Sequence, residues 1–175
     1  AGNSINDIFE DTQHNLWIST DGGLCRLNRD LEQFIRVFPN EKNPHLVLSN
    51  LAEDKANKLW VAGTDGALYR KEGDSFVTFP NPENTSSIIE FIILDNGLFW
   101  LSYANYQLFE FNPQTGGFRL LKNNPNQEIL SFFEDEQSRV WLGLNGGGIQ
   151  IYDAPNKDWH NLKHKPDERN SLPND

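Results

Sequence analysis

Short apolar runs alternate with polar turn segments along the whole chain, and the same arrangement recurs about every 40 residues. A unit opens with two apolar residues and an acidic pair, as in Ile5, Ile8, Glu10 and Asp11. A polar turn, a second run around Trp17, a break and two further short runs complete it. Alternation with period two, and Gly, Asn or Asp at the breaks, are typical of antiparallel strands joined by tight turns. The pattern therefore predicts an all-β chain of four-stranded units.

Four tryptophans mark the repeat at spacings of 43, 40 and 41 residues: Trp17, Trp60, Trp100 and Trp141. An aspartate precedes three of them by six residues and the third of them by five: Asp11, Asp54, Asp135 and Asp95. We expect each aspartate to open a tight turn by accepting hydrogen bonds from the following backbone amides. On this alignment the third copy has lost one turn residue. Because the acidic pairs recur in the copies, they indicate architecture rather than catalysis.

A four-stranded unit of this size cannot bury both of its faces alone, and stacking copies around an axis solves the problem. The fold class predicted is a β-propeller of four-stranded antiparallel blades, with each tryptophan filling the gap between neighbouring blades. Four blades are expected at about 3–38, 45–79, 87–121 and 128–162, with 163–175 leading into a further blade. We expect the chain to be a fragment of a larger propeller. A parallel β-helix would have a shorter repeat, and a sandwich would not repeat its tryptophan in a fixed frame.

The first copy carries the motif most fully, in Ile5, Ile8, Glu10, Asp11, Leu16, Trp17, Ile18, Thr20, Gly22, Gly23 and Leu24. This motif resembles the two-component regulator propeller repeat. The second copy matches it through Leu51, Glu53, Asp54, Leu59 and Trp60, and the fourth through Phe132, Glu134, Asp135, Val140, Trp141 and Gly143. In the third copy Leu94 stands for the glutamate, and Tyr106 and Gln107 stand for the glycines.

The resemblance implies a seven-bladed propeller in the periplasmic or extracellular sensor of a hybrid two-component regulator. Such regulators are typical of Bacteroidetes, where they often respond to polysaccharide breakdown products. The resemblance also implies an immunoglobulin-like domain and a membrane-spanning histidine kinase elsewhere in the parent protein.

Charge and composition limit the kinds of molecule that the chain is expected to bind. The net charge is −10, from 25 acidic and 15 basic residues, and the basic residues are scattered. Such a chain repels phosphate backbones, so neither nucleic acid nor membrane binding through a basic patch is expected. The longest apolar runs, such as 91–94, are far too short to span a membrane. The sequence has no phosphate loop, nucleophile elbow or zinc-type histidine spacing, so we expect no catalytic residue, metal or cofactor.

Departure from the repeat gives the candidate binding site. Turns between the second and third strands emerge on the propeller face that usually binds ligands, and most copies place small residues there. The third copy instead carries Tyr103, Asn105 and Tyr106. Aromatic rings and amides suit a sugar, so we expect an oligosaccharide site here, with Asn145 and Asp65 from the corresponding turns. The alternative is that this blade has drifted and its tyrosines pack on a neighbour.

Polar residues of the first strands form a second candidate set, at positions that would face the channel of a propeller. Asp7, Asn50 and Ser131 share one frame, in which Phe91 is the odd member, and Asn6, Ser49 and Glu90 share the next. They could bind a ligand, although water is the simplest occupant of such a channel.

The function that we expect is a non-catalytic, extracytoplasmic sensor module that detects an oligosaccharide or relays its binding. The alternative is a protein-interaction scaffold in a surface or secretion assembly. A propeller lyase or hydrolase would need a histidine and carboxylates that converge on one face. Because an open arc would leave apolar blade faces exposed, we also expect two chains to meet through those faces as a homodimer.

Overall fold

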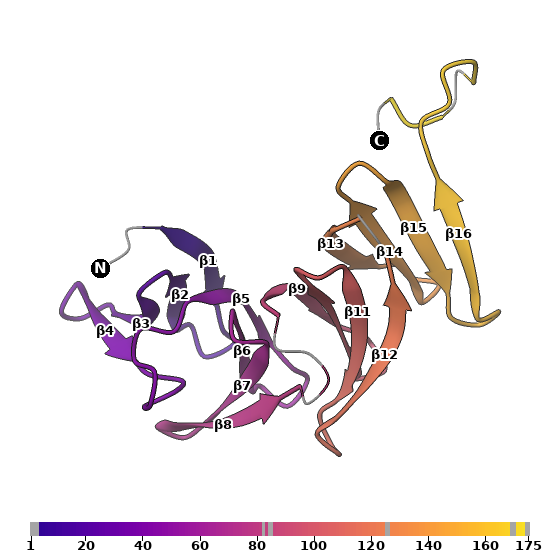
Figure 1. The fold of residues 1–175 in the computed structure, drawn as a ribbon. Helices are drawn as coiled ribbons and strands as arrows, with labels where there is room; N and C mark the ends of the chain where they lie inside the picture. The colour runs from indigo at the N-terminus through magenta and orange to yellow at the C-terminus, as the bar shows by residue number, and fades with distance from the viewer. Residues whose placement is uncertain (1–3, 82, 84–85, 125–126, 169–170, 174–175) are drawn as a thin grey trace. The chain divides into compact units, whose positions relative to one another are not determined.

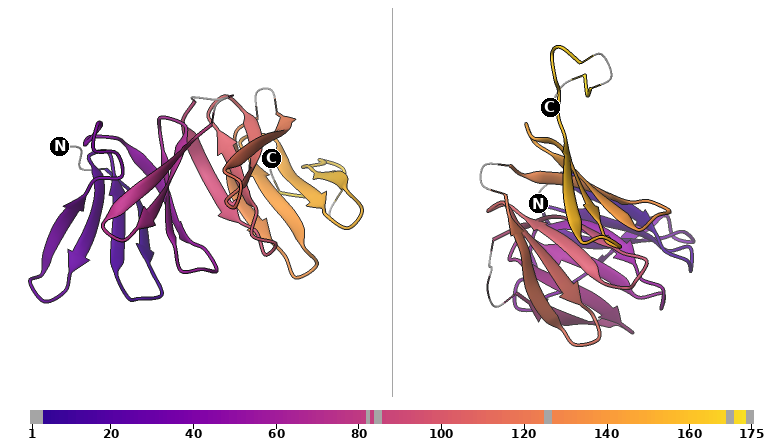
Figure 2. Two further views of the ribbon diagram at one scale, coloured as in Figure 1. Left: turned by 90° about the horizontal axis from the view of Figure 1, so that it is seen from below. Right: turned by 90° about the vertical axis from the view of Figure 1, so that its right-hand side faces the viewer.

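The computed structural model describes residues 4–81, 83, 86–124, 127–168 and 171–173. Within these ranges the chain forms four antiparallel sheets of four strands each, in which neighbours in sequence are neighbours in the sheet (Figure 1). We call the sheets blades 1 to 4. Figure 2 shows the strands of each blade lying side by side with a twist. The all-β prediction is confirmed.

The strand bounds follow the repeat. Blade 1 contains β1 (Ile5–Glu10), β2 (Leu16–Thr20), β3 (Gly23–Asn28) and β4 (Gln33–Val37). Blade 2 contains β5 (Leu48–Glu53), β6 (Leu59–Gly63), β7 (Ala67–Glu72) and β8 (Ser75–Pro80). Blade 3 contains β9 (Ile88–Ile93), β10 (Phe99–Tyr103), β11 (Gln107–Asn112) and β12 (Gly117–Asn123). Blade 4 contains β13 (Ile129–Glu134), β14 (Arg139–Leu144), β15 (Gly148–Asp153) and β16 (Asp158–Leu162).

Residues beyond blade 4 were predicted to lead into another blade. Of that segment, Arg169, Asn170, Asn174 and Asp175 lie outside the described residues. In the described part, His164 and Leu172 form an isolated β-bridge. No described helix has the length and apolar character needed to cross a bilayer.

The chain forms two units, Ala1–Ile89 and Glu90–Asp175, which we call the first and second units. In the first unit Trp17, 1% exposed, packs in one core with Leu24 of blade 1 and with Leu51 and Val61 of blade 2. An indole buries roughly 200 Å², which at about 25 cal/mol per Å² stabilises the folded chain by about 5 kcal/mol before entropy is counted. The prediction that the tryptophan fills the gap between blades is confirmed for this pair.

The second unit repeats this packing. Trp100, 3% exposed, lies in one core with Leu108 of blade 3 and with Val140 and Leu142 of blade 4. Its ring also stacks on Trp159 at a centroid distance of 5.9 Å. Two blades therefore share one core in each unit.

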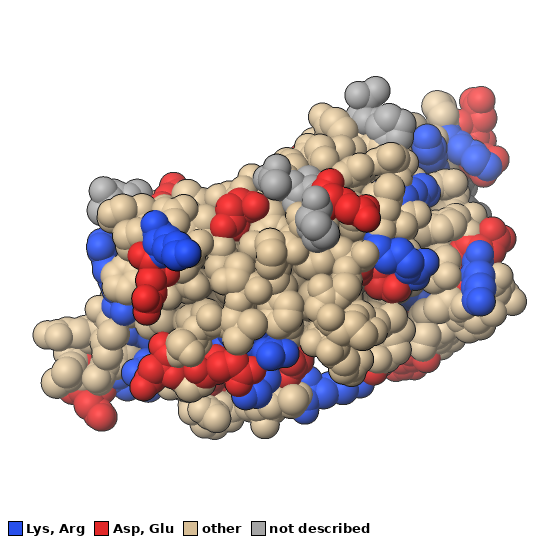
Figure 3. All heavy atoms as spheres, turned by 60° about the horizontal axis from the view of Figure 1, so that its bottom comes forward, with Lys and Arg blue, Asp and Glu red and all other residues tan. Residues whose placement is uncertain are grey.

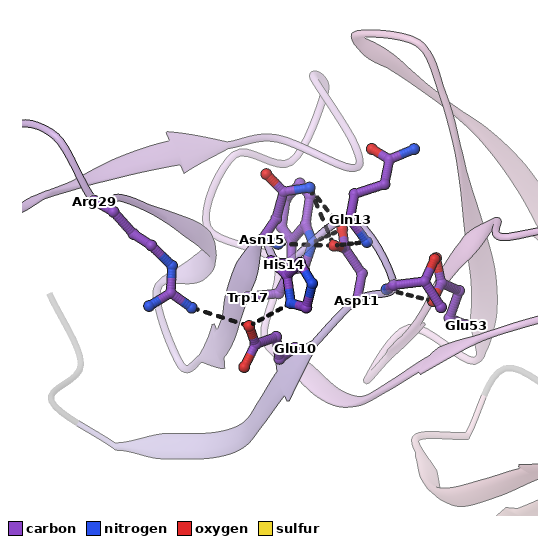
Figure 4. A network of polar contacts seen from close by, with 9 residues as sticks. Glu10, Asp11, Gln13, His14, Asn15, Trp17, Arg29 and Glu53 are labelled. Atoms are coloured by element: carbon purple, nitrogen blue, oxygen red, sulfur yellow. Dashed lines mark hydrogen bonds and ion pairs between the residues drawn. The ribbon is translucent and has the colours of Figure 1, made fainter.

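The predicted turn aspartates are confirmed in three blades, and Figure 4 shows the first of them. Asp11 accepts hydrogen bonds from the backbone N–H of Gln13 (3.0 Å) and Asn15 (2.8 Å) and from Trp17 Nε1 (2.8 Å). The equivalent indole bonds join Trp60 to Asp54 (2.7 Å) and Trp141 to Asp135 (2.8 Å). The carboxylate thus holds the turn and satisfies a tryptophan N–H that would otherwise be buried unpaired.

The alignment of the third copy on Asp95 is wrong. The closing bonds of the turn run from Leu94 N to Leu98 O and from Gly97 N to Leu94 O, as they run from Asp11 N to Asn15 O and from His14 N to Asp11 O. The residue with a left-handed backbone conformation in each turn confirms this alignment. It comes three positions after Asp11, Asp54, Leu94 and Asp135, respectively, and is His14, Asn57, Gly97 or Ser138. Leu94 therefore takes the place of the aspartate, six residues before Trp100, and no turn residue has been lost.

A second carboxylate joins neighbouring blades. Glu53 of blade 2 accepts hydrogen bonds from Thr12 N (2.8 Å) and Thr12 Oγ1 (3.0 Å) in the turn of blade 1. In the second unit, Glu134 of blade 4 accepts one from Asp95 N (2.6 Å) in the turn of blade 3. Glu53 and Glu134 thus each hold the turn of the blade before their own.

Replacing Glu53 by glutamine is expected to lower the free energy of unfolding by about 1 kcal/mol, because one of the two Thr12 bonds loses its carboxylate acceptor. Urea unfolding followed by tryptophan fluorescence would measure the change. Glu10→Gln is the matched control, since Glu10 pairs with the exposed side chains of His14 and Arg29 (Figure 4) and should change stability by less than about 0.5 kcal/mol. Equal effects of the two changes would contradict the inter-blade role.

Two blade faces expose apolar side chains. On blade 1 these are Ile5, Ile8 and Phe34, which are 59%, 57% and 56% exposed. On blade 4 they include Phe133, 62% exposed, and the half-buried Trp141. Surfaces of this kind are typical of packing sites for another sheet.

Candidate functional site

The candidate site centres on the turn between β10 and β11 in the second unit. Tyr106 N donates to Tyr103 O (2.9 Å), which closes the turn. The Asn105 side chain donates to Gln107 Oε1 (2.9 Å) and is exposed, and the Tyr106 ring is 39% exposed. This turn therefore exposes both an asparagine and the tyrosine that follows it.

Tyr106 adopts an unusual backbone conformation, with φ at +67°. The corresponding residue of blade 2 is Gly66, whose φ is +82° and whose N–H closes the same turn onto Gly63 O. Left-handed angles cost a residue with a side chain about 1 kcal/mol or more, a cost that glycine avoids. Blade 3 thus keeps a bulky ring where the turn favours glycine, and strained residues of this kind cluster at functional sites.

The connector from blade 3 to blade 4 links this turn to the next one. Asn124 N donates to Tyr106 O (2.9 Å), Gln127 N donates to Asn124 O (3.0 Å), and Asn145 N donates to Glu128 O (2.9 Å). Asn124 is 3% exposed, and its Nδ2 has no hydrogen-bond partner among the residues that the structure describes. Backbone hydrogen bonds of Asn124, Gln127 and Glu128 therefore connect the turn of Tyr106 with the turn of Asn145.

Two predicted site residues lie elsewhere. Tyr103 is fully buried, with its ring edge-on to Phe109 at 5.4 Å, so it supports the turn and cannot stack on a sugar. Asp65 belongs to the first unit, where its carboxylate accepts hydrogen bonds from Tyr69 Oη and Ala67 N. Burial and the Asp65 hydrogen bond both raise the pKa of Tyr69 well above its usual value. The structure thus leaves Asn105, Tyr106 and Asn145 as the exposed members of the candidate set.

Several polar residues of the first strands join neighbouring blades. Asp7 accepts a hydrogen bond from Leu51 N (2.8 Å), and Asn6 donates one to Leu48 O (2.8 Å). Ser49 donates to Ile88 O (3.1 Å). These contacts give the three side chains a structural role within the first unit.

Metal binding and catalysis would both depend on titratable side chains, and one carboxylate among those described has a strongly shifted pKa. No group of three or more His, Cys, Asp or Glu side chains is placed there to hold a metal ion. Burial would raise the pKa of Asp135, but hydrogen bonds from Trp141 and Arg139 lower it to about 2. Its shifted pKa is thus explained by the turn rather than by a reaction.

The fold and the motif together define a class of protein: a β-propeller whose blades repeat an aspartate six residues before a tryptophan. Comparison with known proteins is consistent with this, since the family model described as "Two component regulator propeller" matches residues 1–22. The histidine kinase P4 of Formosa agariphila is 38% identical over 72 residues, which is 37% of this chain and 5% of that protein.

Solved structures confirm the fold class. The extracellular domain assigned to the one component system BT4673 of B. thetaiotaomicron superposes with a TM-score of 0.78 at 20% identity, over 91% of this chain and 22% of that one. That of the hybrid two component system BT3049 gives 0.76 at 20% identity, over 94% and 25%. Virginiamycin B lyase from Staphylococcus aureus gives 0.74 at 11% identity, over 94% and 57%. The chain therefore spans about a quarter or less of the extracellular domains that it resembles.

Proposed function

We propose that this chain is part of the extracytoplasmic sensor domain of a two-component signalling protein and that it is not itself an enzyme. The observation that carries the proposal is the two component regulator propeller match, in a chain whose fold is shared with the extracellular domains BT4673 and BT3049. The identity to a histidine kinase over 72 residues supports the same class. Virginiamycin B lyase has the same fold, so the fold alone does not decide against catalysis.

The ligand proposed is a neutral oligosaccharide, bound at the surface formed by Asn105, Tyr106 and Asn145. A sugar offers an apolar ring face to an aromatic side chain and hydroxyls to amides, and this surface has both. The strained backbone of Tyr106 supports a selected role for its ring. On the face drawn in Figure 3, basic side chains lie beside acidic ones without forming a continuous basic surface, as suits a ligand without phosphate.

Tyr106→Gly is the most direct test, because glycine removes the ring and relieves the left-handed strain together. A glycan array would identify the ligand, and calorimetry would then compare the variants. We expect Tyr106→Gly to weaken binding about tenfold while thermal stability stays equal or rises. Asn145→Ala should also weaken binding, whereas Asn161→Ala, an exposed asparagine on β16, should not.

The oligosaccharide proposal would be contradicted if the chain bound no glycan on the array. It would also be contradicted if the Tyr106→Gly variant bound the glycan as tightly as the parent chain. Binding of a protein partner under those conditions would favour the scaffold alternative. The homodimer through the exposed faces of blades 1 and 4 stays a prediction.

A further inference from the structure

The first unit contains a pocket between blades 1 and 2, at the end of the sheets where the β1–β2 and β7–β8 turns lie. Its volume is about 260 Å³, and it is lined by Trp17, Arg26, Glu53, Lys71 and the turn residues around Asp11. This size lies just below the usual range of small-molecule sites. The pocket is at the opposite end of the strands from the β6–β7 turn, so it is separate from the type of surface proposed above.

Two cations share this pocket without a carboxylate partner. The Arg26 guanidinium lies over the Trp17 ring at 5.9 Å from the centroid, and the Lys71 ammonium at 5.8 Å. Both residues are half-buried, and neither forms an ion pair with any carboxylate in the described part of the chain. Lys71 Nζ donates to the backbone oxygen of Gly73. Both cations line the pocket, so an anion bound there would be attracted by two positive charges.

The carboxylates of the pocket are engaged by other donors. Asp11 accepts from backbone amides, from Asn15 Nδ2 and from Trp17 Nε1, and burial, which would raise its pKa, is outweighed by these bonds, which lower it. Glu53 accepts from Thr12. Lys58 at the rim already pairs with Glu72 at 2.7 Å. Arg26 and Lys71 are therefore the charged donors lining this pocket that form no ion pair in the described part of the chain.

The second unit provides an internal comparison, because the repeat builds the same pocket between blades 3 and 4. That pocket has a volume of about 190 Å³ and is lined by Trp100, Glu110, Glu134 and Tyr152. Arg26 pairs across the strands with Trp17 as Glu110 does with Trp100, so Glu110 takes the place of Arg26. Tyr152 takes the place of Lys71, and Glu110 is paired with Arg119 at 2.7 Å. Since no lysine or arginine is among the described residues that line the second pocket, the fold does not require Arg26 and Lys71 in the first.

We propose that the pocket between blades 1 and 2 binds the carboxylate group of a small hydroxylated acid. A guanidinium matches a planar carboxylate through two parallel hydrogen bonds, and the lysine adds a second charge. The exposed amides of Gln13 and Asn57, which also line the pocket, suit hydroxyl groups. A net charge of −10 disfavours polyanions such as phosphates, so an acid with a single carboxylate is the better match for this pocket. This inference does not rest on the proposed function.

Calorimetric titration of the chain with D-glucuronate tests the proposal, with D-glucose as the neutral match and acetate as the bare carboxylate. The titration is done at an ionic strength of about 10 mM, where charges are screened least. We expect D-glucuronate to bind, acetate to bind more weakly and D-glucose not to bind. The double change Arg26→Gln with Lys71→Gln should weaken D-glucuronate binding at least tenfold. Arg26→Glu with Lys71→Tyr, which installs the pair of the second unit, should abolish it.

The matched control removes two positive charges elsewhere, through Arg119→Gln and Lys165→Gln in the second unit. Both side chains are exposed, so the chain keeps its fold, and we expect D-glucuronate affinity to change less than twofold. The proposal is overturned if this control weakens binding as much as the pocket variant does. It is also overturned if D-glucose binds equally well, if acetate matches D-glucuronate, or if D-glucuronate gives no binding at low salt. The Tyr106→Gly variant should bind D-glucuronate normally, which separates this site from the oligosaccharide surface.

Discussion

Replacing Asp11 by alanine is expected to lower the free energy of unfolding by about 2–4 kcal/mol. The change removes the acceptor of two backbone amides and of Trp17 Nε1, and Trp17 is 1% exposed, so water cannot replace the lost partner. Urea unfolding at neutral pH, followed by tryptophan fluorescence and by circular dichroism, would measure the loss.

Asp95→Ala is the matched control for this experiment. A simple alignment of the letters makes Asp95 the counterpart of Asp11, but the turn geometry gives that place to Leu94. Asp95 is exposed, and its backbone N–H, which donates to Glu134, survives the change. We therefore expect a loss of less than about 0.5 kcal/mol. A loss as large as that of Asp11→Ala would contradict the frame that the structure assigns to blade 3.

The dependence of stability on acidic pH gives a second test of the hydrogen bonds that Asp11 accepts. Because hydrogen bonds depress the pKa of Asp11 in the folded chain, its contribution is present above its ordinary pKa of 3.8 and is lost as the pH falls through the lower, folded value. Asp135, with a folded pKa of about 2, gives the corresponding window between roughly pH 4 and pH 2. The Asp11→Ala variant should lose less stability than the parent chain over that acid range.

The sequence predicts the strands and the turns well because both depend on local chemistry. The period-two runs locate all four blades, and β8 and β12 end only one and two residues beyond the predicted blade ends. The indole bond of Asp54 to Trp60 spans six residues, so a repeated spacing reveals it. Glu53 is different, because its partner Thr12 is 41 residues away and no spacing within one copy points to that contact.

The candidate sites were harder to predict from the sequence because they depend on contacts and side-chain directions that a spacing within one copy does not show. Tyr103 and Tyr106 read alike in the sequence, yet one points into the core and the other into solvent, because they lie on either side of a turn. Arg26 and Lys71 are 45 residues apart and line one pocket only because blades 1 and 2 pack together over Trp17. The signal that could have found them is the position opposite the tryptophan, compared between copies.

Leu94→Asp is expected to be less destabilising than Leu94→Ala, although it introduces a charge at a site that is 4% exposed. Alanine leaves a cavity beside Trp100 in the core of the second unit and should cost about 2–4 kcal/mol. Aspartate also loses the leucine contacts, but its carboxylate would occupy the place that Asp11 has in blade 1, within reach of Trp100 Nε1 and of the amides two and four residues later.

The cost of Leu94→Asp should therefore fall to about 1–2 kcal/mol at neutral pH, since hydrogen bonds to a charged acceptor offset part of the lost burial. The nearby Glu110 and Glu134 oppose the new charge, so the offset is incomplete. Acidification should erase the advantage over alanine, because a protonated aspartate is a weaker acceptor for the same donors. Urea unfolding of both variants at pH 7 and near pH 3 would measure this, and Leu94→Asn, with the same shape and no charge, should lie between them. If Leu94→Asp costs as much stability as Leu94→Ala at pH 7, the new carboxylate does not form the hydrogen bonds that Asp11 forms in blade 1. Leu94 and Asp11 would then share a backbone position in the turn but not an equivalent side-chain environment.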